Sequence, residues 1–190
     1  MKRLVAGTTN SHKVHEIRSA LRTLSGWTVE ALPAGVPDVD ETGSTFLENA
    51  IQKAIHFSLH VDGLILADDS GLCVDALDGR PGIRSARYAE DAQSRIARLL
   101  GEMEHVADAQ RSARFVCALA LARTGRLIHT VEAEVAGRIT RTPSGGHGFG
   151  YDPVFYLPEL GRTMAELTTE EKQMISHRGL ALAELVKHLA

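Results

Sequence analysis

The sequence predicts an α/β fold built on a mixed β-sheet with flanking helices. Three observations support this prediction. Residues 3–7, with apolar Leu4, Val5 and Ala6 at their centre, are expected to form a short buried strand, and a polar turn and a helical pattern follow them. Further strand-like and helix-like segments then alternate along the chain. Finally, Thr124-Gly125 separates two strand-like segments, which predicts a hairpin and so some antiparallel pairing.

The first half of the chain contains two helical patterns between strand candidates. Residues 27–32 form the second strand candidate, and the Pro-, Gly- and Asp-rich residues 33–43 a loop. Thr45 and Glu48 have the spacing of a capping box, which predicts a helix from there to about His60. Residues 64–67 form a strand expected to end at Asp68, with 72–77 a candidate for another. The first helix has its apolar positions on one face, at Val14, Ile17, Leu21 and Leu24.

The second half adds a helix near residues 91–103 after a loop at 78–88. Residues 114–122 and 127–135 are the arms of the predicted hairpin. A glycine-rich loop at 144–150 leads into residues 153–156. Thr168 and Glu171 form a second possible capping box. A final helix follows, with apolar positions at Leu180, Ala183, Leu185, Val186 and Leu189.

Length and composition indicate one domain, residues 1–190, with room for two lobes. The chain has 190 residues, 44% of them hydrophobic, and no internal repeat. No apolar run approaches the ~20 residues of a membrane span, and the N-terminus lacks a signal-peptide pattern. We therefore expect a cytoplasmic protein that does not bind membranes. Cys73 and Cys117 lie far apart in apolar stretches and are expected to be buried thiols.

The charge balance argues against nucleic acid as a partner. Lys and Arg number 21 against 24 Asp and Glu, a formal net charge of −3. Such a chain has no overall positive field to attract a nucleic acid. Any anionic ligand must be held locally by clustered cations, a helix N-terminus or a bridging metal ion.

Two segments of the first half could bind phosphate or metal. The turn at residues 8–13 joins a strand end to a helix start, where free N–H groups and Lys13 suit a phosphate. Its simpler interpretation is a helix cap at Asn10 with a solvated lysine. Asp68 and Asp69 are adjacent, so their side chains should point to opposite faces and have different roles, one binding Mg²⁺ and one accepting a proton. A polar turn with solvated acids is the alternative.

Two segments of the second half could bind a planar ligand. Phe149 and Tyr151 lie among glycines, which lets the backbone approach a nucleobase while a ring stacks on it. A flexible hairpin with a buried ring is the alternative. Lys172, His177 and Arg178 would supply hydrogen-bond donors for phosphate or a base carbonyl, although the neighbouring serine could simply cap the last helix.

Read together, these segments resemble the inosine triphosphate pyrophosphatase family. The resemblance covers nearly the whole chain in order. Its motifs are Thr8-x-Asn10-x-x-Lys13, Glu41-Thr42-Gly43 with Thr45-Phe46 and Glu48-Asn49-Ala50, Ala67-Asp68-Asp69-Ser70-Gly71-Leu72, Pro81-Gly82 with Ser85-Ala86-Arg87-Tyr88, Phe149-Gly150-Tyr151-Asp152-Pro153, and Ser176-His177-Arg178-Gly179.

The resemblance implies an enzyme that removes non-standard purine nucleotides. Its fold would be an elongated α/β structure with two lobes around a central nucleotide-binding cleft, usually as a homodimer. It would hydrolyse ITP, dITP and XTP to monophosphate and pyrophosphate with Mg²⁺. Asp69 would accept the proton and bind the metal, with Glu41, Asp68 or Asp40 as further candidate ligands. The substrate-binding residues would be Thr8, Thr9, Asn10, Ser11, His12, Lys13, Lys53, Ser70, Phe149, Gly150, Tyr151, Asp152, Lys172, His177 and Arg178.

Base selectivity is expected to depend on Arg178. Hypoxanthine and xanthine have a 6-oxo acceptor where adenine has a 6-amino donor, and arginine only donates. Two rival functions fit parts of the pattern. One is a pyrophosphatase for pyrimidine or modified nucleotides of the Maf type, which the Ser-His-Arg element disfavours. The other is a non-catalytic nucleotide sensor, which has little use for the Asp68-Asp69 pair.

Overall fold

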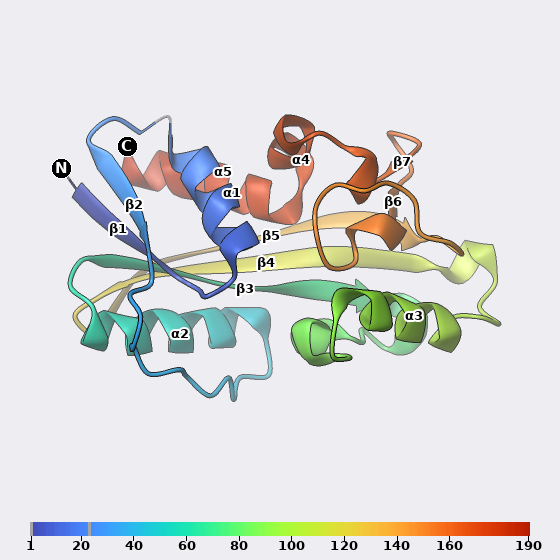
Figure 1. The fold of residues 1–190 in the computed structure, drawn as a ribbon, viewed down its shortest axis with the longest axis horizontal. Helices are drawn as coiled ribbons and strands as arrows, with labels where there is room; N and C mark the ends of the chain where they lie inside the picture. Colours follow the sequence, from blue (N-terminus) through green and yellow to red (C-terminus); the bar gives the residue numbers. More distant parts are fainter. Residues whose placement is uncertain (1, 23) are drawn as a thin grey trace. The chain divides into compact units, whose positions relative to one another are not determined.

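The computed structural model of the protein describes residues 2–22 and 24–190, so Met1 and Thr23 of the predicted domain lie outside the described residues. The strands are β1 (Lys2–Gly7), β2 (Trp27–Ala31), β3 (Leu64–Val74), β4 (Ser112–Arg123), β5 (Arg126–Ile139), β6 (Phe155–Leu157) and β7 (Arg162–Thr163) (Figure 1). The helices are α1 (Ser11–Leu21), α2 (Phe46–His60), α3 (Ala92–Glu102), α4 (Thr169–Ile175) and α5 (His177–Leu189).

The strands form one mixed sheet, in the order β2-β1-β3-β4-β5-β6-β7. Strand β1 pairs in parallel with both β2 and β3, whereas β6 pairs antiparallel with β5 and β7. The hairpin turn between β4 and β5 is at Thr124 and Gly125, which both have positive φ, as a two-residue turn requires. The predicted α/β fold with a mixed sheet and flanking helices is therefore confirmed.

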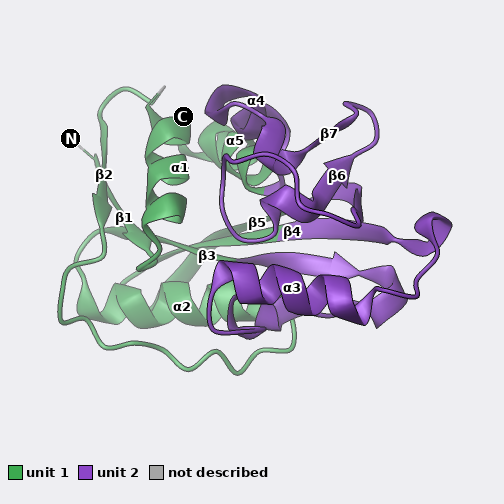
Figure 2. Ribbon diagram, turned by 45° about the vertical axis from the view of Figure 1, so that its right-hand side comes forward, with its two compact units in different colours: residues 1–69, 117–133, 178–190 green, residues 70–116, 134–177 purple. Residues whose placement is uncertain are grey.

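The chain divides into two compact units (Figure 2). Unit 1 comprises residues 1–69, 117–133 and 178–190, and unit 2 comprises residues 70–116 and 134–177. Unit 1 contains β1, β2, α1 and α2, and unit 2 contains α3, α4, β6 and β7. We describe each unit by itself.

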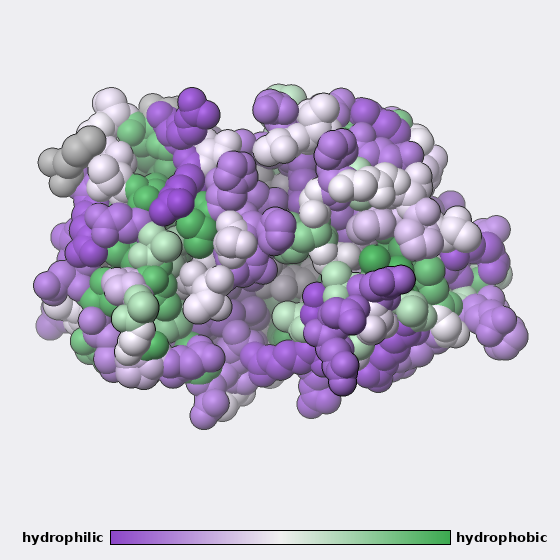
Figure 3. All heavy atoms as spheres, in the orientation of Figure 1, coloured by the Kyte–Doolittle hydropathy of each residue, from purple (hydrophilic) through white to green (hydrophobic). Residues whose placement is uncertain are grey.

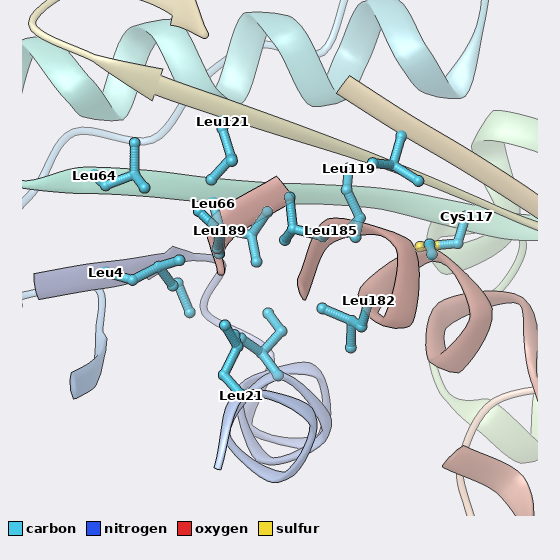
Figure 4. Close-up of a cluster of buried hydrophobic side chains, with 14 of the residues drawn as sticks. Leu4, Leu21, Leu64, Leu66, Cys117, Leu119, Leu121, Leu182, Leu185 and Leu189 are labelled. Atoms are coloured by element: carbon cyan, nitrogen blue, oxygen red, sulfur yellow. The ribbon is translucent and has the colours of Figure 1, made fainter. Parts of the chain in front are cut away.

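Unit 1 has helices on both faces of its part of the sheet. Helices α1 and α5 cover one face and α2 covers the other (Figures 1 and 2). Strand β1 shows why both faces are apolar: Leu4 joins the core beneath α1 and α5, whereas Val5 joins Phe57 of α2 on the opposite face. Figure 4 shows the first core, where leucines of β1, β3, β4, α1 and α5 approach one another. This arrangement allows residues next to each other in a strand to meet different helices.

Unit 2 has an aromatic-rich core of its own. Phe115 of β4 and Phe155 of β6 are in ring contact, with centroids 4.3 Å apart. Leu99 and Met103 of α3 are fully buried in the same cluster. Tyr151, which follows the glycine-rich loop, also lies in this cluster. The core therefore anchors one end of the loop predicted to bind a nucleobase.

Strand β3 differs from the sequence prediction. The strand was expected to end at Asp68, but it continues without a break through Ser70 to Val74. The expectation followed the turn-forming composition of residues 68–71. However, β3 lies beside β4 as well as β1, whose pairing ends at Ala67, and cations neutralise both carboxylates. Tertiary pairing thus overrides a local preference for a turn. The acidic pair lies inside the strand.

Hydrophilic residues cover much of the face seen in Figure 3, with hydrophobic residues in separate patches. Exposed large hydrophobic side chains such as Leu59 and Met174 are common on protein surfaces. Among the described residues, none of the helices has the length and apolar character needed to span a bilayer. Cys73 and Cys117 are both buried free thiols, as the sequence predicted.

Candidate functional site

Asp68 and Asp69 contact different helices, because consecutive residues of β3 point to opposite faces of the sheet. Asp68 meets Lys13 of α1 and Arg178 of α5. Asp69 meets Asn49 and Lys53 of α2. The prediction that the two carboxylates have different roles is consistent with this separation. All of these residues belong to unit 1.

Asp68 is a buried anion surrounded by donors. Its carboxylate pairs with Lys13 and, at 2.8 Å, with Nε of Arg178. The thiol of Cys117 also donates to it, with Sγ 3.3 Å from Oδ2. Burial alone would raise the pKa of Asp68, but the charges of Arg178 and Lys13 outweigh burial and hold it well below its usual range. Asp68 is therefore paired with two cations, which makes Asp69 the better candidate metal ligand of the two.

Arg178 lies within the protein and not at its surface. Only 2% of the residue is exposed, and its Nη1 donates to Glu16 at 2.6 Å while Nε donates to Asp68. A role in reading the base would require the guanidinium to exchange these carboxylates for the ligand. In this arrangement Arg178 is the counter-charge of Asp68 and Glu16, and its expected role as the reader of the base stays a prediction.

Asp69 is held at both oxygens by α2. Asn49 donates to Oδ2 at 3.2 Å and Lys53 donates to Oδ1 at 2.9 Å. Asn49 and Lys53 are four residues apart, so they lie on the same face of the helix. Burial raises the pKa of Asp69 despite the opposing charge of Lys53. A raised pKa favours proton acceptance by this carboxylate.

Glu41 reaches the same lysine from the loop before α2. Its Oε1 lies 2.6 Å from Nζ of Lys53. The loop is tied to α2 by Asn49, which accepts from the N–H of Gly43, and by Gln52, which accepts from the N–H of Thr42. A Cβ at Gly43 would lie 2.6 Å from Oδ1 of Asn49, so glycine permits this close approach.

Of the two neighbouring acids in this loop, the structure brings Glu41 to Lys53 and leaves Asp40 exposed. Glu41 is half-buried beside Asp69, whereas Asp40 faces solvent. Glu41 is therefore the better candidate metal ligand of the pair.

A divalent metal fits the Glu41 and Asp69 carboxylates. Both approach a single cationic atom, Nζ of Lys53, so their oxygens already converge on one point. Across residues 2–22 and 24–190, no three His, Cys, Asp or Glu side chains gather into a metal-binding group. Mg²⁺ commonly takes one or two protein carboxylates and completes its shell with phosphate and water. This donor set thus suits Mg²⁺ carried with a phosphate and does not suit a zinc site.

The turn at residues 8–13 is a capped helix start. The side chain of Asn10 accepts from the N–H groups of His12 and Lys13, and the Thr8 hydroxyl accepts from the N–H of Asn10. Asn10 is therefore the helix cap that the simpler interpretation proposed. Thr9, Ser11 and His12 are exposed around it. The side chain of Lys13 extends from this turn to Asp68 of the acidic pair.

In unit 2, the glycine-rich loop folds around Asp152. The carboxylate of Asp152 accepts from the N–H of Phe149 at 2.7 Å and from Nζ of Lys172 at 2.8 Å. The same Nζ lies 4.7 Å from the centre of the Phe149 ring. Gly148 has φ of +77°, and a Cβ there would lie 2.1 Å from Oδ2 of Asp152. Phe149, Asp152 and Lys172 are thus brought together, as the sequence predicted.

Other residues of unit 2 that were predicted to bind substrate are buried or half-buried and contact the rest of the protein. Tyr151 is buried and its hydroxyl donates to the carbonyl of Ser85 at 3.0 Å. His177 is buried and stacks on Phe115, with ring centroids 4.7 Å apart. Gly150 is half-buried with positive φ, and Ser70 is half-buried within β3. Within this unit, Tyr151 therefore ties the loop to the core, and His177 packs on one of the core's aromatic rings.

Three residues of the unit 1 cluster had no role in the sequence prediction. Asn49 was part of a recognised motif, and its four-residue spacing from Lys53 could have indicated a shared target. Glu16 and Cys117 gave no such signal, because their partners are distant in sequence. Arg178 and Glu16 are 162 residues apart, and Cys117 and Asp68 are 49 apart.

Comparisons with known proteins agree on one family. The model of the Ham1 family matches residues 4–188. The chain is 53% identical to a dITP/XTP pyrophosphatase of Geobacillus kaustophilus, over 97% of this chain and 93% of that protein. It is 45% identical to the dITP/XTP pyrophosphatase of Bacillus subtilis, over 100% and 98%. A HAM1 protein from Coxiella burnetii has a similar structure, with a TM-score of 0.90, 42% identity and coverage of 100% and 98%.

Proposed function

The chain belongs to the Ham1 family, and from this premise we propose that it hydrolyses ITP, dITP and XTP to the monophosphate and pyrophosphate. Such an activity removes non-standard purine nucleotides before they enter DNA or RNA. The names of the relatives support the substrate class. The observation that carries the proposal is the convergence of Glu41 and Asp69 on one cation, Lys53.

Asp69 is the proposed general base. Its buried carboxylate is oriented by Asn49, and its pKa is raised, so it can take a proton from water. The water oxygen forms a bond to the α or β phosphorus, and the bond from that phosphorus to the oxygen between α and β breaks, so that monophosphate and pyrophosphate separate. The water proton passes to Asp69. Lys13 and Lys53 neutralise phosphate oxygens. Positioning and electrostatics thus supply most of the rate.

Mg²⁺ is the proposed cofactor, with Glu41 and Asp69 as its protein ligands. These two carboxylates would hold the ion, and when bound it would neutralise the charge that develops on the phosphate. Asp68 takes a different part in this proposal. Its buried carboxylate holds Lys13 and Arg178 in place on the other face of β3.

Phe149 is the proposed platform for the base. Its backbone is fixed by Asp152, and Asp152 is in turn neutralised by Lys172. Stacking on an aromatic ring contributes about 1–3 kcal/mol per base and does not depend on base identity. Lys172, a donor-only side chain beside the ring, is the proposed partner of the 6-oxo group.

The location and assembly of the protein are further parts of the proposal. We place it in the cytoplasm, as a homodimer that binds neither nucleic acid nor membranes. The net charge of −3 supports the absence of a nucleic-acid partner. Light scattering of the purified protein during gel filtration tests the dimer directly, because a monomer would have a mass of 20.6 kDa.

Product analysis tests the proposed reaction. Purified protein is incubated with dITP and Mg²⁺, and the products are separated by ion-exchange chromatography. We expect dIMP and pyrophosphate in equal amounts, and at least ~10²-fold slower formation of both with the Asp69→Asn variant. Release of orthophosphate with dIDP would show a different cleavage, and intact dITP would indicate a non-catalytic binding protein.

Metal removal tests the proposed cofactor. We expect EDTA to abolish dITP turnover and Mn²⁺ to restore part of it, because both Mg²⁺ and Mn²⁺ accept octahedral oxygen coordination. Turnover is followed as pyrophosphate release after dialysis against the chelator. Full activity in exhaustively chelated protein would contradict the proposed role of the metal.

A further inference from the structure

Lys53 is surrounded by oxygen atoms. Its Nζ lies 2.6 Å from Oε1 of Glu41, 2.9 Å from Oδ1 of Asp69 and 3.2 Å from the carbonyl oxygen of Asp68. A lysine ammonium has three N–H donors, and here each has an oxygen partner. Only 12% of the side chain is exposed. The ammonium is therefore bound much as a small cation would be.

This position coincides with the one that a divalent metal would need. Glu41 and Asp69 are the carboxylates best placed to bind Mg²⁺, and the metal would have to approach the same two oxygens. An ammonium and a divalent cation repel each other strongly at such short range. Both cannot occupy the space between these carboxylates together.

We propose that Lys53 is an internal cation that holds the metal position between Glu41 and Asp69 until a nucleotide triphosphate draws it away. Lys53 has a flexible four-carbon stem, so its ammonium can move to a phosphate oxygen while α2 stays in place. Metal and nucleotide then assist each other's binding, because each favours the state in which Lys53 has left the carboxylates. The inference rests on the proposed function and concerns how that site is regulated.

The surroundings of Lys53 make this inference testable by substitution. Asn49 contacts Oδ2 of Asp69, whereas Lys53 contacts Oδ1. Asn49 should therefore keep Asp69 oriented when the ammonium of Lys53 is removed. The Glu41 loop is tied to α2 through Asn49 and Gln52, independently of Lys53. Replacing Lys53 by methionine should thus vacate the oxygen-lined position without dispersing its ligands.

The experiment measures Mn²⁺ binding to nucleotide-free protein by the electron paramagnetic resonance of free Mn²⁺. We expect Lys53→Met to bind Mn²⁺ ~10-fold or more tightly than the unmodified protein, a coupling of ordinary size. Lys13→Met is the matched control, since it removes the same charge nearby but leaves Lys53 in place. The double variant Lys53→Met with Asp69→Asn should lose the gain, which locates it at this site.

Circular dichroism and thermal melts accompany each titration. We expect Mn²⁺ to raise the melting temperature of Lys53→Met more than that of the Lys13→Met control. If Lys53→Met does not fold, Lys53→Gln carries the same expectation. Equal or weaker Mn²⁺ binding by a folded Lys53 variant, compared with Lys13→Met, would overturn the inference. Because no nucleotide is present, this outcome is independent of dITP turnover, which alone decides the proposed function.

Discussion

At the scale of single residues, the opposite orientation of the Asp68 and Asp69 side chains was predictable and their partners were not. Alternation along a strand is enough to separate adjacent side chains. It does not say which helix covers each face. The partner of Asp68 on α5 lies 110 residues further along the chain, and only the folded structure brings the two together.

Replacing Asp69 by asparagine tests its role as the proton acceptor. The substitution keeps the shape of the side chain and removes its charge. We expect kcat to fall by at least ~10²-fold while nucleotide binding is largely kept, because the lost interaction is made in the transition state. Steady-state kinetics with dITP and equilibrium binding of a non-hydrolysable analogue provide the two measurements. Near-normal turnover in the folded variant would remove Asp69 from the mechanism.

Replacing Arg178 by alanine separates a counter-charge from a base reader. Asp68 would remain buried without its main partner, and breaking a buried ion pair in this way costs about 3–5 kcal/mol of folding stability. We expect a clear loss of stability in chemical denaturation and lower activity on ITP and ATP alike. Arg123→Ala, at an exposed end of β4, is the control and should change neither.

The ratio of kcat/KM for ITP over ATP distinguishes the two roles of Arg178. A ratio that survives the Arg178→Ala substitution fits the counter-charge role seen in the structure. A ratio that collapses towards one would instead show that Arg178 leaves its carboxylates and contacts the base in the complex.

At the scale of elements, strong local signals were reliable. The cap at Thr168 with Glu171 and the Thr124-Gly125 turn occur where predicted. The apolar face of α1 is confirmed at Val14, Ile17 and Leu21, but the helix ends before Leu24. The cap at Thr45 was half right: Thr45 accepts from the N–H of Glu48, but the Glu48 carboxylate binds Ser44 instead of closing the box.

Residues 68–71 show the limit of local signals. Their composition is typical of a turn, and β3 nevertheless continues through them. Lys13, Lys53 and Arg178 neutralise the carboxylates of Asp68 and Asp69, which lowers the free-energy cost of burying these two charges. No pattern within the segment itself could indicate cations supplied by three separate helices.

The glycine-rich loop offers an element-scale prediction at Gly148. An alanine there would have positive φ and a Cβ 2.1 Å from Asp152, so the loop must shift and the Phe149 platform with it. We expect kcat/KM for dITP to fall roughly 10-fold or more, since small displacements of a binding group are costly.

The matched control in this loop is Gly146→Ala. A Cβ at Gly146 meets no atom within 4 Å, so the variant should behave like the unmodified protein. Kinetics of both variants, with thermal melts to verify folding, give the comparison. If both substitutions changed kcat/KM equally, the close approach of Gly148 to Asp152 would not determine the position of Phe149.

At the scale of the whole molecule, a negatively charged protein is proposed to bind a highly charged anion. The net charge of −3 gives no general attraction for a triphosphate. Local groups must supply it, and the proposed ones are Lys13 and Lys53 of unit 1, each paired with a carboxylate in the structure. In this proposal, binding of a triphosphate replaces lysine–carboxylate ion pairs with contacts between the lysines and phosphate oxygens.

The central claim, selective hydrolysis of non-standard purine triphosphates, is tested most directly by internal competition. Equal concentrations of dITP, XTP, ATP, GTP and dTTP are mixed with the protein and Mg²⁺, and chromatography follows the disappearance of each. Because the substrates compete for the same enzyme, their relative rates give the ratios of kcat/KM. We predict that dITP and XTP are consumed at least ~10-fold faster than ATP, as expected when one buried donor distinguishes an oxo from an amino group. Preferential loss of dTTP, or equal loss of all five nucleotides, would contradict the account.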